Sequence, residues 1–375
     1  MSASMPVEAC VLPLDGAPIA LSCFDPSEEL VWSASGSGMV YSHLLPTLEP
    51  YSAFRCDESM TPAVGLYPNP YGIIVLTHDA VNFFSKGGIS QGPPVRRDEL
   101  AGATCGCLVP SASSTRLAVV SAFDPQAPSL ALLDLNNQAA VASTLSLEAP
   151  YTMALYDASS SLLCLSGADG SVAAYDLRAS GSRPAGKCAL FPNKTNVVCA
   201  MDLQGTTLVA SALRAQLGPL GGNEYVFDTY LRTLDLRAMR KATDIFSAAG
   251  AMQVKWYFGS GTGHPQVLAA SASGQLSLLD SRGGMTAPTE TQLSLPDRGE
   301  QLCSLDVSAT SQLICAGGSQ GSFTMCADAE IEVEALQCNV YPNQVSLPSE
   351  LPSGPAERTR RVAVIVACLR REAGE

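Results

Sequence analysis

The chain has 375 residues, of which 46% are hydrophobic and only 15% charged, and it contains 31 glycines and 25 prolines. This composition excludes a disordered polar chain and suits many short elements joined by turns. The formal net charge of −13 argues against a broad phosphate-binding surface. The best candidate for a local basic patch is Glu357–Arg361. No apolar run approaches the roughly 20 residues of a membrane span, and the N-terminus lacks the features of a secretory signal.

The 13 cysteines are scattered along the chain. An odd number without a signal peptide argues for a reducing compartment, so we expect a cytoplasmic or nuclear protein. Several cysteines sit inside alternating apolar runs, where buried thiols are usual: Cys164, Cys199, Cys303, Cys315 and Cys326.

A repeated pattern begins at Phe24 and returns at Tyr156 and Leu305. The three stretches are FDPSEELVWSASGSGMVYSHL, YDASSSLLCLSGADGSVAAYDLR and LDVSATSQLICAGGSQGSFTM. Each has an aromatic residue or Leu, then Asp, a small polar turn, an apolar run, a Gly/Ser turn and a second apolar run. This order predicts two antiparallel strands joined by a tight turn.

A second marker ends the repeat and recurs as LDLN, YDLR, LDLR and LDSR. Its aspartates are Asp134, Asp176, Asp235 and Asp280, which are 42, 59 and 45 residues apart. A period of about 40–45 residues is typical of a four-stranded WD40 blade, here with Tyr or Leu in place of the signature Trp. The longest interval is expected to contain a loop insertion around Arg214–Asp228.

Seven such units follow one another in the chain, which predicts an all-β, WD40-type β-propeller over residues 1–328. The units are Phe24–Leu44, Tyr71–Gly88, Cys105–Asn137, Met153–Ala179, Cys199–Met239, Val254–Gly284 and Cys303–Ala327. Blades must stack in a ring to bury their faces. We expect Glu8–Leu14 to provide the strand that closes the last blade. Residues 329–361, rich in Pro and Ser and then charged, are predicted to be a largely irregular linker, followed by a short tail at 362–375.

Candidate metal or catalytic residues do not form a cluster in the sequence. The three histidines lack close pairing: His43 is expected to follow the outer strand of the first unit, His78 to lie within the second, and His264 to lie in a turn. All three are expected to be structural or solvent-exposed. Cys105 and Cys107 would share one face of a strand, where chelation is conceivable, but a buried pair of small hydrophobic residues is favoured. Gly259–Pro265 lacks the context of a phosphate loop and is expected to be a surface turn.

The recurring charged residues are also expected to be structural. Asp25, Asp157, Asp202 and Asp306 occur in different blades, each before the inner hairpin, where a carboxylate can accept backbone N–H groups and hold a turn. Arg178 and Arg237 are expected to pack or pair at strand ends. No nucleophile–base–acid set emerges, so we predict no catalytic, cofactor-binding or metal-binding residues and no enzyme activity for this chain.

Three phrases resemble a known family. They are FDP with EELVW (Phe24–Pro26, Glu28–Trp32) followed by YSAF (Tyr51–Phe54), then Phe227–Ile245, and finally Ser304–Phe323. Together they are similar to the N-terminal WD40 domain of the catalytic subunit of the Pan poly(A)-specific deadenylase. The resemblance extends over roughly Ile19 to Pro352 and is weakest in the middle.

The resemblance implies a non-catalytic scaffold in messenger RNA decay. In the family the propeller precedes a ubiquitin-hydrolase-like domain and a nuclease domain that shortens poly(A) tails, and this chain is expected to carry neither. Propeller and linker would bind the pseudokinase adaptor, a homodimer that brings the complex to poly(A) messenger ribonucleoprotein, in the cytoplasm or processing bodies. No catalytic residue carries over; Tyr341, Pro342 and Asn343 are candidate adaptor contacts by position.

Two alternatives stay open from the sequence. A generic WD40 interaction scaffold in another cytoplasmic complex would use the same fold. A propeller enzyme with a metal or cofactor in its central channel would need ligands that the three histidines hardly supply.

Overall fold

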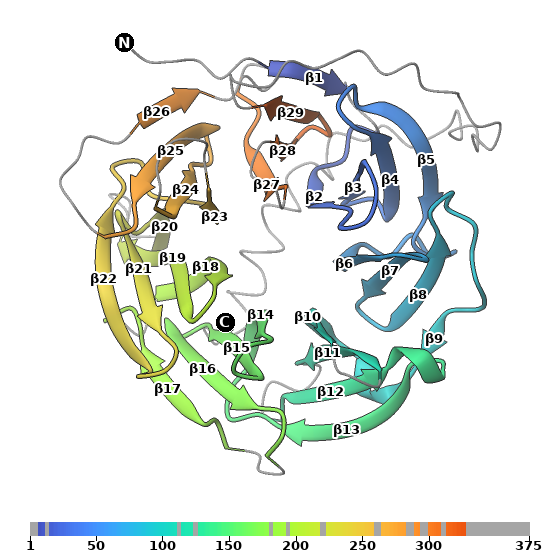
Figure 1. Cartoon of the computed structure of the whole chain (residues 1–375), viewed down its shortest axis with the longest axis horizontal. Helices are drawn as coiled ribbons and strands as arrows, with labels where there is room; N and C mark the ends of the chain where they lie inside the picture. The colour runs from blue at the N-terminus through green and yellow to red at the C-terminus, as the bar shows by residue number, and fades with distance from the viewer. Residues whose placement is uncertain are drawn as a thin grey trace.

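The strands form a ring of seven antiparallel sheets around a central axis (Figure 1). The computed structural model describes residues 7–11, 15–110, 114–122, 127–179, 183–192, 196–217, 223–258, 264–282, 289–292, 299–308 and 313–327. This confirms the predicted seven-bladed propeller. The predicted linker and tail, at 329–361 and 362–375, lie outside the described residues.

Each blade runs from an inner strand to an outer strand, and blades 1 to 7 follow the chain. Blades 1 to 3 come first: blade 1 is β2 (Ile19–Phe24), β3 (Leu30–Ser35), β4 (Met39–Leu44) and β5 (Glu49–Arg55); blade 2 is β6 (Ala63–Asn69), β7 (Gly72–Thr77), β8 (Ala80–Ser85) and β9 (Val95–Arg96); blade 3 is β10 (Ala103–Pro110), β11 (Thr115–Ser121), β12 (Ser129–Asp134) and β13 (Ala140–Ser146). Blade 4 is β14 (Tyr151–Asp157), β15 (Leu162–Gly167), β16 (Ser171–Asp176) and β17 (Gly186–Ala189), and blade 5 is β18 (Asn196–Gln204), β19 (Thr207–Leu217), β20 (Asn223–Phe227), β21 (Tyr230–Asp235) and β22 (Arg240–Phe246). Blade 6 is β23 (Gln253–Tyr257), β24 (Gln266–Ala270), β25 (Gln275–Asp280) and β26 (Thr289–Gln292), and blade 7 is β27 (Leu302–Val307), β28 (Leu313–Gly318) and β29 (Phe323–Ala327) with β1 (Val7–Val11). Among the described residues, short 3-10 helices lie at Asp98–Leu100 and Leu135–Asn137.

The N-terminal strand closes the ring, as predicted. β1 pairs antiparallel with β29, with Cys10 opposite Thr324 and Val11 opposite Phe323. Blade 7 therefore combines strands from both ends of the described chain (Figure 1). Without β1 the outer edge of β29 would be unpaired.

The repeated Gly residues lie in the turns that the sequence predicted, and the aspartates of the repeat-ending marker also hold turns. Gly38, Gly170 and Gly321 lie between the second and third strands of their blades with φ of 85°, 73° and 90°, a backbone conformation that glycine adopts without penalty. At the next turn, the aspartate that ends β12, β16, β21 or β25 accepts the N–H of the residue two positions on. These bonds join Asp134 to Asn136, Asp176 to Arg178, Asp235 to Arg237 and Asp280 to Arg282, at 2.9–3.0 Å.

The core lies between neighbouring blades rather than within one sheet. Between blades 3 and 4, for example, Val120 and Leu130 pack in one cluster with Tyr151, Leu163 and Tyr175. The sheets carry apolar side chains on both faces because each blade is covered on both sides. Since every blade depends on two neighbours, the ring must be complete for its core to be buried.

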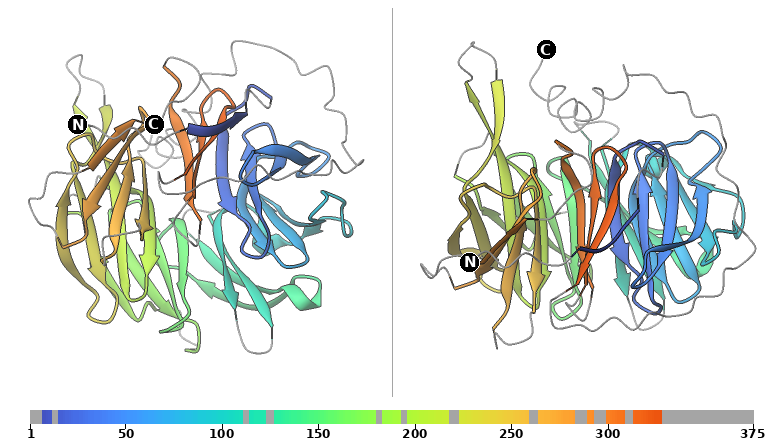
Figure 2. Two further views of the ribbon diagram at one scale, coloured as in Figure 1. Left: turned by 45° about the horizontal axis from the view of Figure 1, so that its top comes forward. Right: turned by 90° about the horizontal axis from the view of Figure 1, so that it is seen from above.

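The long interval in blade 5 contains strands where the sequence predicted a loop. β19 continues to Leu217, and β20 pairs with it in register from Leu213 opposite Phe227 to Leu217 opposite Asn223. The extended hairpin rises above the ring in the right-hand view of Figure 2. No helix in the described part of the chain has the length and apolar character to cross a membrane.

Gly38→Ala is expected to lower the free energy of unfolding by about 2–4 kcal/mol. A Cβ at this position would lie 2.5 Å from the backbone oxygen of Met60, and φ there is +85°. Gly205 is the matched control, because its φ is +54° and an added Cβ would meet nothing within 4 Å. Gly205→Ala should therefore cost only about 1 kcal/mol, for the left-handed backbone alone. Urea unfolding measures both; equal losses would show that the Met60 contact is unimportant.

Candidate interaction face

One face of the ring carries the turns between the first and second strand of every blade, and we call it the turn face. The predicted aspartates of blades 1 and 4 lie here and hold these turns. Asp157 accepts hydrogen bonds from the backbone N–H of Ser159 at 2.9 Å and from the hydroxyl of Ser160. Burial opposes ionisation of Asp157, but hydrogen bonds from Ser160 and Ser159 outweigh it and lower the pKa of this carboxyl. The turn-holding interpretation is confirmed for this residue.

Asp25 holds its turn and also reaches the next blade. Its carboxylate accepts the backbone N–H of Ser27 at 3.0 Å and the indole N–H of buried Trp32 at 3.1 Å. Lys86 of blade 2 donates to the same carboxylate. Burial favours a higher pKa for Asp25, but the bonds from Lys86, Ser27 and Trp32 outweigh it, so the pKa lies below its ordinary value. The side chain is thus a charged link between blades 1 and 2.

Asp202 and Asp306 have a different role from the predicted one. Both accept backbone N–H groups, but from the following blade. Asp202 Oδ2 accepts the N–H of Trp256 in blade 6 at 2.7 Å, and Asp306 Oδ2 accepts the N–H of Phe24 in blade 1 at 3.0 Å. The second bond spans the ring closure, because Asp306 belongs to blade 7.

Lys255 lies between these two aspartates, and its Nζ is 2.7 Å from Asp306 Oδ1. Burial by itself would lower the pKa of Lys255, but the charges of Asp306 and Asp202 outweigh it and raise the pKa. Burial raises the pKa of Asp202, and Lys255 offsets part of that rise. The lysine therefore stays charged and balances carboxylates from blades 5 and 7.

These contacts form a continuous series, which we call the inter-blade belt. It consists of Asp202, Lys255, Asp306, Asp25 and Lys86, and it joins blade 5 to 6, 6 to 7, 7 to 1 and 1 to 2. A hollow of about 190 Å³ opens beside Lys255 and Asp306 and is partly lined by the half-exposed Phe258. The belt links blades, and its two lysines are paired with two of its three aspartates, which favours a structural role over catalysis.

Neither lysine of the belt was predicted from the sequence. Lys255 interrupts the apolar inner strand QVKWY, which is a signal for a buried ion pair. Lys86 sits in a glycine-rich turn and gave no such signal.

The pairing of two arginines at strand ends was predicted from the sequence. Arg178 bonds Asp176 through Nε and Nη2 at 2.9 Å, and Arg237 Nε lies 3.7 Å from Asp235.

The histidines occupy three separate places. His43 lies within the third strand of blade 1, not after the outer strand as expected, and stacks on Phe323 of blade 7 with ring centroids 5.5 Å apart. His78 Nδ1 is 2.7 Å from the carbonyl oxygen of Ala103 in blade 3. His264 is exposed before β24. Within the described residues, no three His, Cys, Asp or Glu side chains gather closely enough to hold a metal ion.

Protonation of His43 is expected to destabilise the ring below pH 6.5. The side chain is 1% exposed, its Nδ1 lacks a hydrogen-bond partner within the described structure, and burial lowers its pKa to about 4. In the unfolded chain the histidine binds its proton near pH 6.5. The contribution of neutral His43 to the free energy of unfolding is therefore fully present above that pH and is lost as the pH falls toward 4. Between pH 7 and 5 the loss should be about 2 kcal/mol. Urea unfolding of the wild type and of His43→Leu at both pH values measures this loss. The His43→Leu variant should not show the drop in the free energy of unfolding between pH 7 and 5, whereas a His264→Leu variant, changed at an exposed position, should show it in full. An unchanged pH dependence in His43→Leu would contradict the assignment.

Most of the cysteines pack as predicted for small hydrophobic residues, but Cys199 and Cys303, also expected to be buried, are not fully buried. Cys105 and Cys107 are buried in the cluster between blades 3 and 4, and burial raises the pKa of Cys105 to about 12. Cys164, Cys315 and Cys326 are also buried, whereas Cys199 and Cys303 are partly exposed.

Exposed aromatic side chains occur on both faces of the ring. Tyr71 is 85% exposed at the turn between β6 and β7 on the turn face. On the opposite face, at the base of the extended hairpin, Tyr230 and Phe246 are paired across β21 and β22 with ring centroids 5.6 Å apart. Exposed aromatics are frequent at protein interfaces. The predicted adaptor contacts Tyr341, Pro342 and Asn343 lie outside the described residues.

Comparisons with known proteins agree on one family. The family model described as PAN2 N-terminal matches residues 7–327. A PAN2-PAN3 deadenylation complex catalytic subunit PAN2 from Meyerozyma guilliermondii is 23% identical over 317 residues, which cover 76% of this chain and 27% of that protein. Its counterpart from Phaeosphaeria nodorum is 22% identical over 270 residues, covering 70% of this chain and 22% of that protein. The chain thus spans about a quarter of the length of these relatives.

A shorter sequence match and the fold of a solved structure complete the comparisons. The Yarrowia lipolytica protein of the same name is 35% identical over 68 residues, which cover 18% of this chain and 6% of that protein. The fold is that of the Neurospora crassa Pan2 WD40 domain, with a TM-score of 0.72 at 15% identity, over 88% of this chain and 98% of that structure.

Proposed function

Because the chain belongs to the PAN2 N-terminal family, we propose that it is the propeller scaffold of a Pan deadenylase and binds the PAN3 subunit. The observation that carries the proposal is the family match over residues 7–327, which spans the whole described propeller. The relatives are named as catalytic subunits of the PAN2-PAN3 complex. The matched region is the propeller, and in this proposal it would contribute binding to the complex rather than catalysis.

The scaffold role follows from how a propeller presents side chains. A rigid ring holds turns from several blades on one face, where they can contact a partner together. The inter-blade belt of ion pairs and hydrogen bonds joins blades 5, 6, 7, 1 and 2 on the turn face, and exposed Tyr71 and Phe258 lie on that same face. The adaptor subunit, acting as a homodimer, would bring the complex to poly(A) messenger ribonucleoprotein in the cytoplasm or in processing bodies.

Affinity purification of the tagged chain from its own cells, followed by mass spectrometry, tests this function. We expect the PAN3 subunit and poly(A)-binding protein to be enriched. A tagged chain with Tyr341, Pro342 and Asn343 replaced by Ala should recover less PAN3 if the region after the propeller contributes. Enrichment of a different complex without PAN3 would favour a generic WD40 scaffold instead, and a stoichiometric metal in the purified protein would revive an enzyme in the channel.

A further inference from the structure

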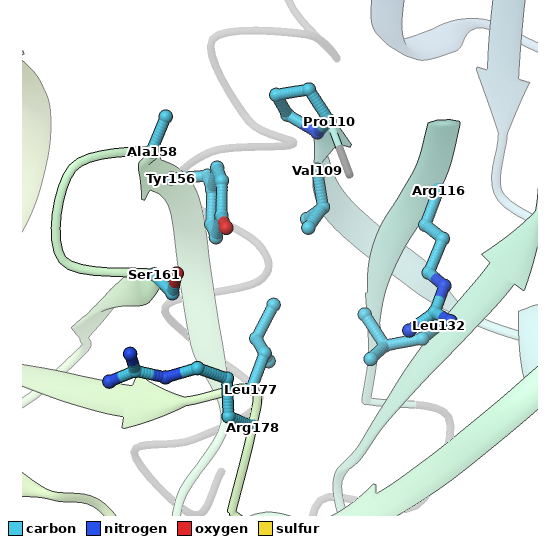
Figure 3. A pocket seen from close by; sticks show the side chains of 9 residues that line it. All are labelled: Val109, Pro110, Arg116, Leu132, Tyr156, Ala158, Ser161, Leu177 and Arg178. Atoms are coloured by element: carbon cyan, nitrogen blue, oxygen red, sulfur yellow. The ribbon is translucent and has the colours of Figure 1, made fainter. Parts of the chain in front are cut away.

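A second hollow on the turn face lies between blades 3 and 4, where the inter-blade belt does not extend. Its volume is about 350 Å³, within the range of small binding pockets. Figure 3 shows Val109, Leu132 and Leu177 facing this space, with Tyr156 on one wall and Arg116 beside Leu132 on the other. The lining of the hollow is therefore mixed: apolar side chains alternate with the polar groups of Arg116, Tyr156, Ser161 and Arg178.

Arg116 is the unusual member of this lining. Its Nε is buried and has no hydrogen-bond acceptor among the described residues. Asp134 lies opposite Arg116 in the register of β11 and β12, but its carboxylate accepts the N–H of Asn136. Arg178, also on the wall, is paired with Asp176. A buried guanidinium N–H without an acceptor is costly, and a carboxylate is the acceptor that satisfies it best.

The shape and charge of the hollow select the ligand. Pro110, Leu177 and the ring of Tyr156, which are exposed or half-buried, offer a surface for an aliphatic side chain, and Arg116 offers one cation for one carboxylate. A polyanion such as RNA is disfavoured, because the chain carries a net charge of −13 and the other arginine of the wall is neutralised. We propose that this hollow binds a peptide segment of a partner protein in which Asp or Glu neighbours a large aliphatic residue. The site goes beyond the proposed function and does not depend on PAN3 being the partner.

Fluorescence anisotropy with two matched peptide pools tests the proposal. One pool contains labelled pentapeptides with central Glu or Asp flanked by Leu, Ile, Val or Met; the other has Gln or Asn at the centre. The acidic pool should bind the full chain roughly tenfold more tightly than the amide pool. Arg116→Gln should remove this difference, because the free guanidinium is lost.

Two further variants separate the pocket from general effects of substitution. Arg178→Gln, which removes an arginine already paired with Asp176, should leave the acidic preference intact. Ala158→Phe at the exposed rim should weaken binding of both pools while Arg116 remains. Thermal unfolding confirms that each variant is folded. Equal affinity for both pools, no binding up to about 1 mM peptide, or unchanged binding by Arg116→Gln would overturn the proposal. Binding of an oligoadenylate at Arg116 in place of the peptides would overturn it as well.

Discussion

Removal of residues 1–14, which contain β1, is expected to destabilise the propeller by roughly 2–4 kcal/mol and to cause aggregation. β1 supplies the outer strand of blade 7, with Ala9 opposite Met325 and Cys10 opposite Thr324. Its loss leaves the edge of β29 unpaired in blade 7, where the ring closes. Because every blade relies on both neighbours, weakening blade 7 should lower the stability of the whole ring.

The measurement for β1 is urea unfolding combined with light scattering of the folded protein. Removal of residues 1–6 is the control, since it shortens the N-terminus and keeps β1. A second test, Cys10→Pro, removes one backbone donor from the ladder without shortening the chain. If the chain without residues 1–14 unfolds at the same urea concentration as the wild type, β1 does not close the ring.

Lys255→Met should lower the free energy of unfolding by about 3 kcal/mol. The substitution removes the cation that lies 2.7 Å from Asp306 and leaves two partly buried carboxylates, Asp202 and Asp306, without a counter-charge. Asp306 also holds the backbone of Phe24 across the ring closure. The loss should therefore weaken contacts between blades 6, 7 and 1 together.

A double-mutant cycle separates the ion pair from other effects of losing the side chain. Lys255→Met combined with Asp306→Asn should recover at least about 1 kcal/mol, because Asn is neutral and keeps an oxygen for the N–H of Phe24. Lys241→Met is the matched control, since Lys241 forms an exposed pair with Asp244 at 2.8 Å and should cost less than about 0.5 kcal/mol. A Lys255→Met variant as stable as Lys241→Met would show that the belt contributes nothing to folding.

The features predicted correctly from sequence are local or periodic. Glycines such as Gly170 and strand-end aspartates such as Asp176 act within a few residues, so their spacing reveals the blades directly. The strand at the N-terminus was predicted because a ring of blades requires closure. The strands of the β19–β20 hairpin were missed because Gly and Pro dominate the segment between them.

The contacts between blades could not be predicted in the same way. Asp306 and Phe24 are 282 positions apart, and only the closed ring brings them together. The same limit applies to Arg116, because whether its Nε finds an acceptor among the described residues depends on how blades 3 and 4 pack. An aspartate before a turn has one sequence signature, yet Asp157 holds its own turn and Asp306 bridges two blades.

Isothermal titration of the purified chain with the purified PAN3 subunit of the same organism tests the scaffold role most directly. We expect saturable binding to residues 1–375, with weaker binding to residues 1–328 if the segment containing Tyr341, Pro342 and Asn343 contributes contacts. Failure of both the full chain and a version extended further at its C-terminus to bind PAN3 would contradict a scaffold role in the deadenylase, while leaving the propeller itself unaffected.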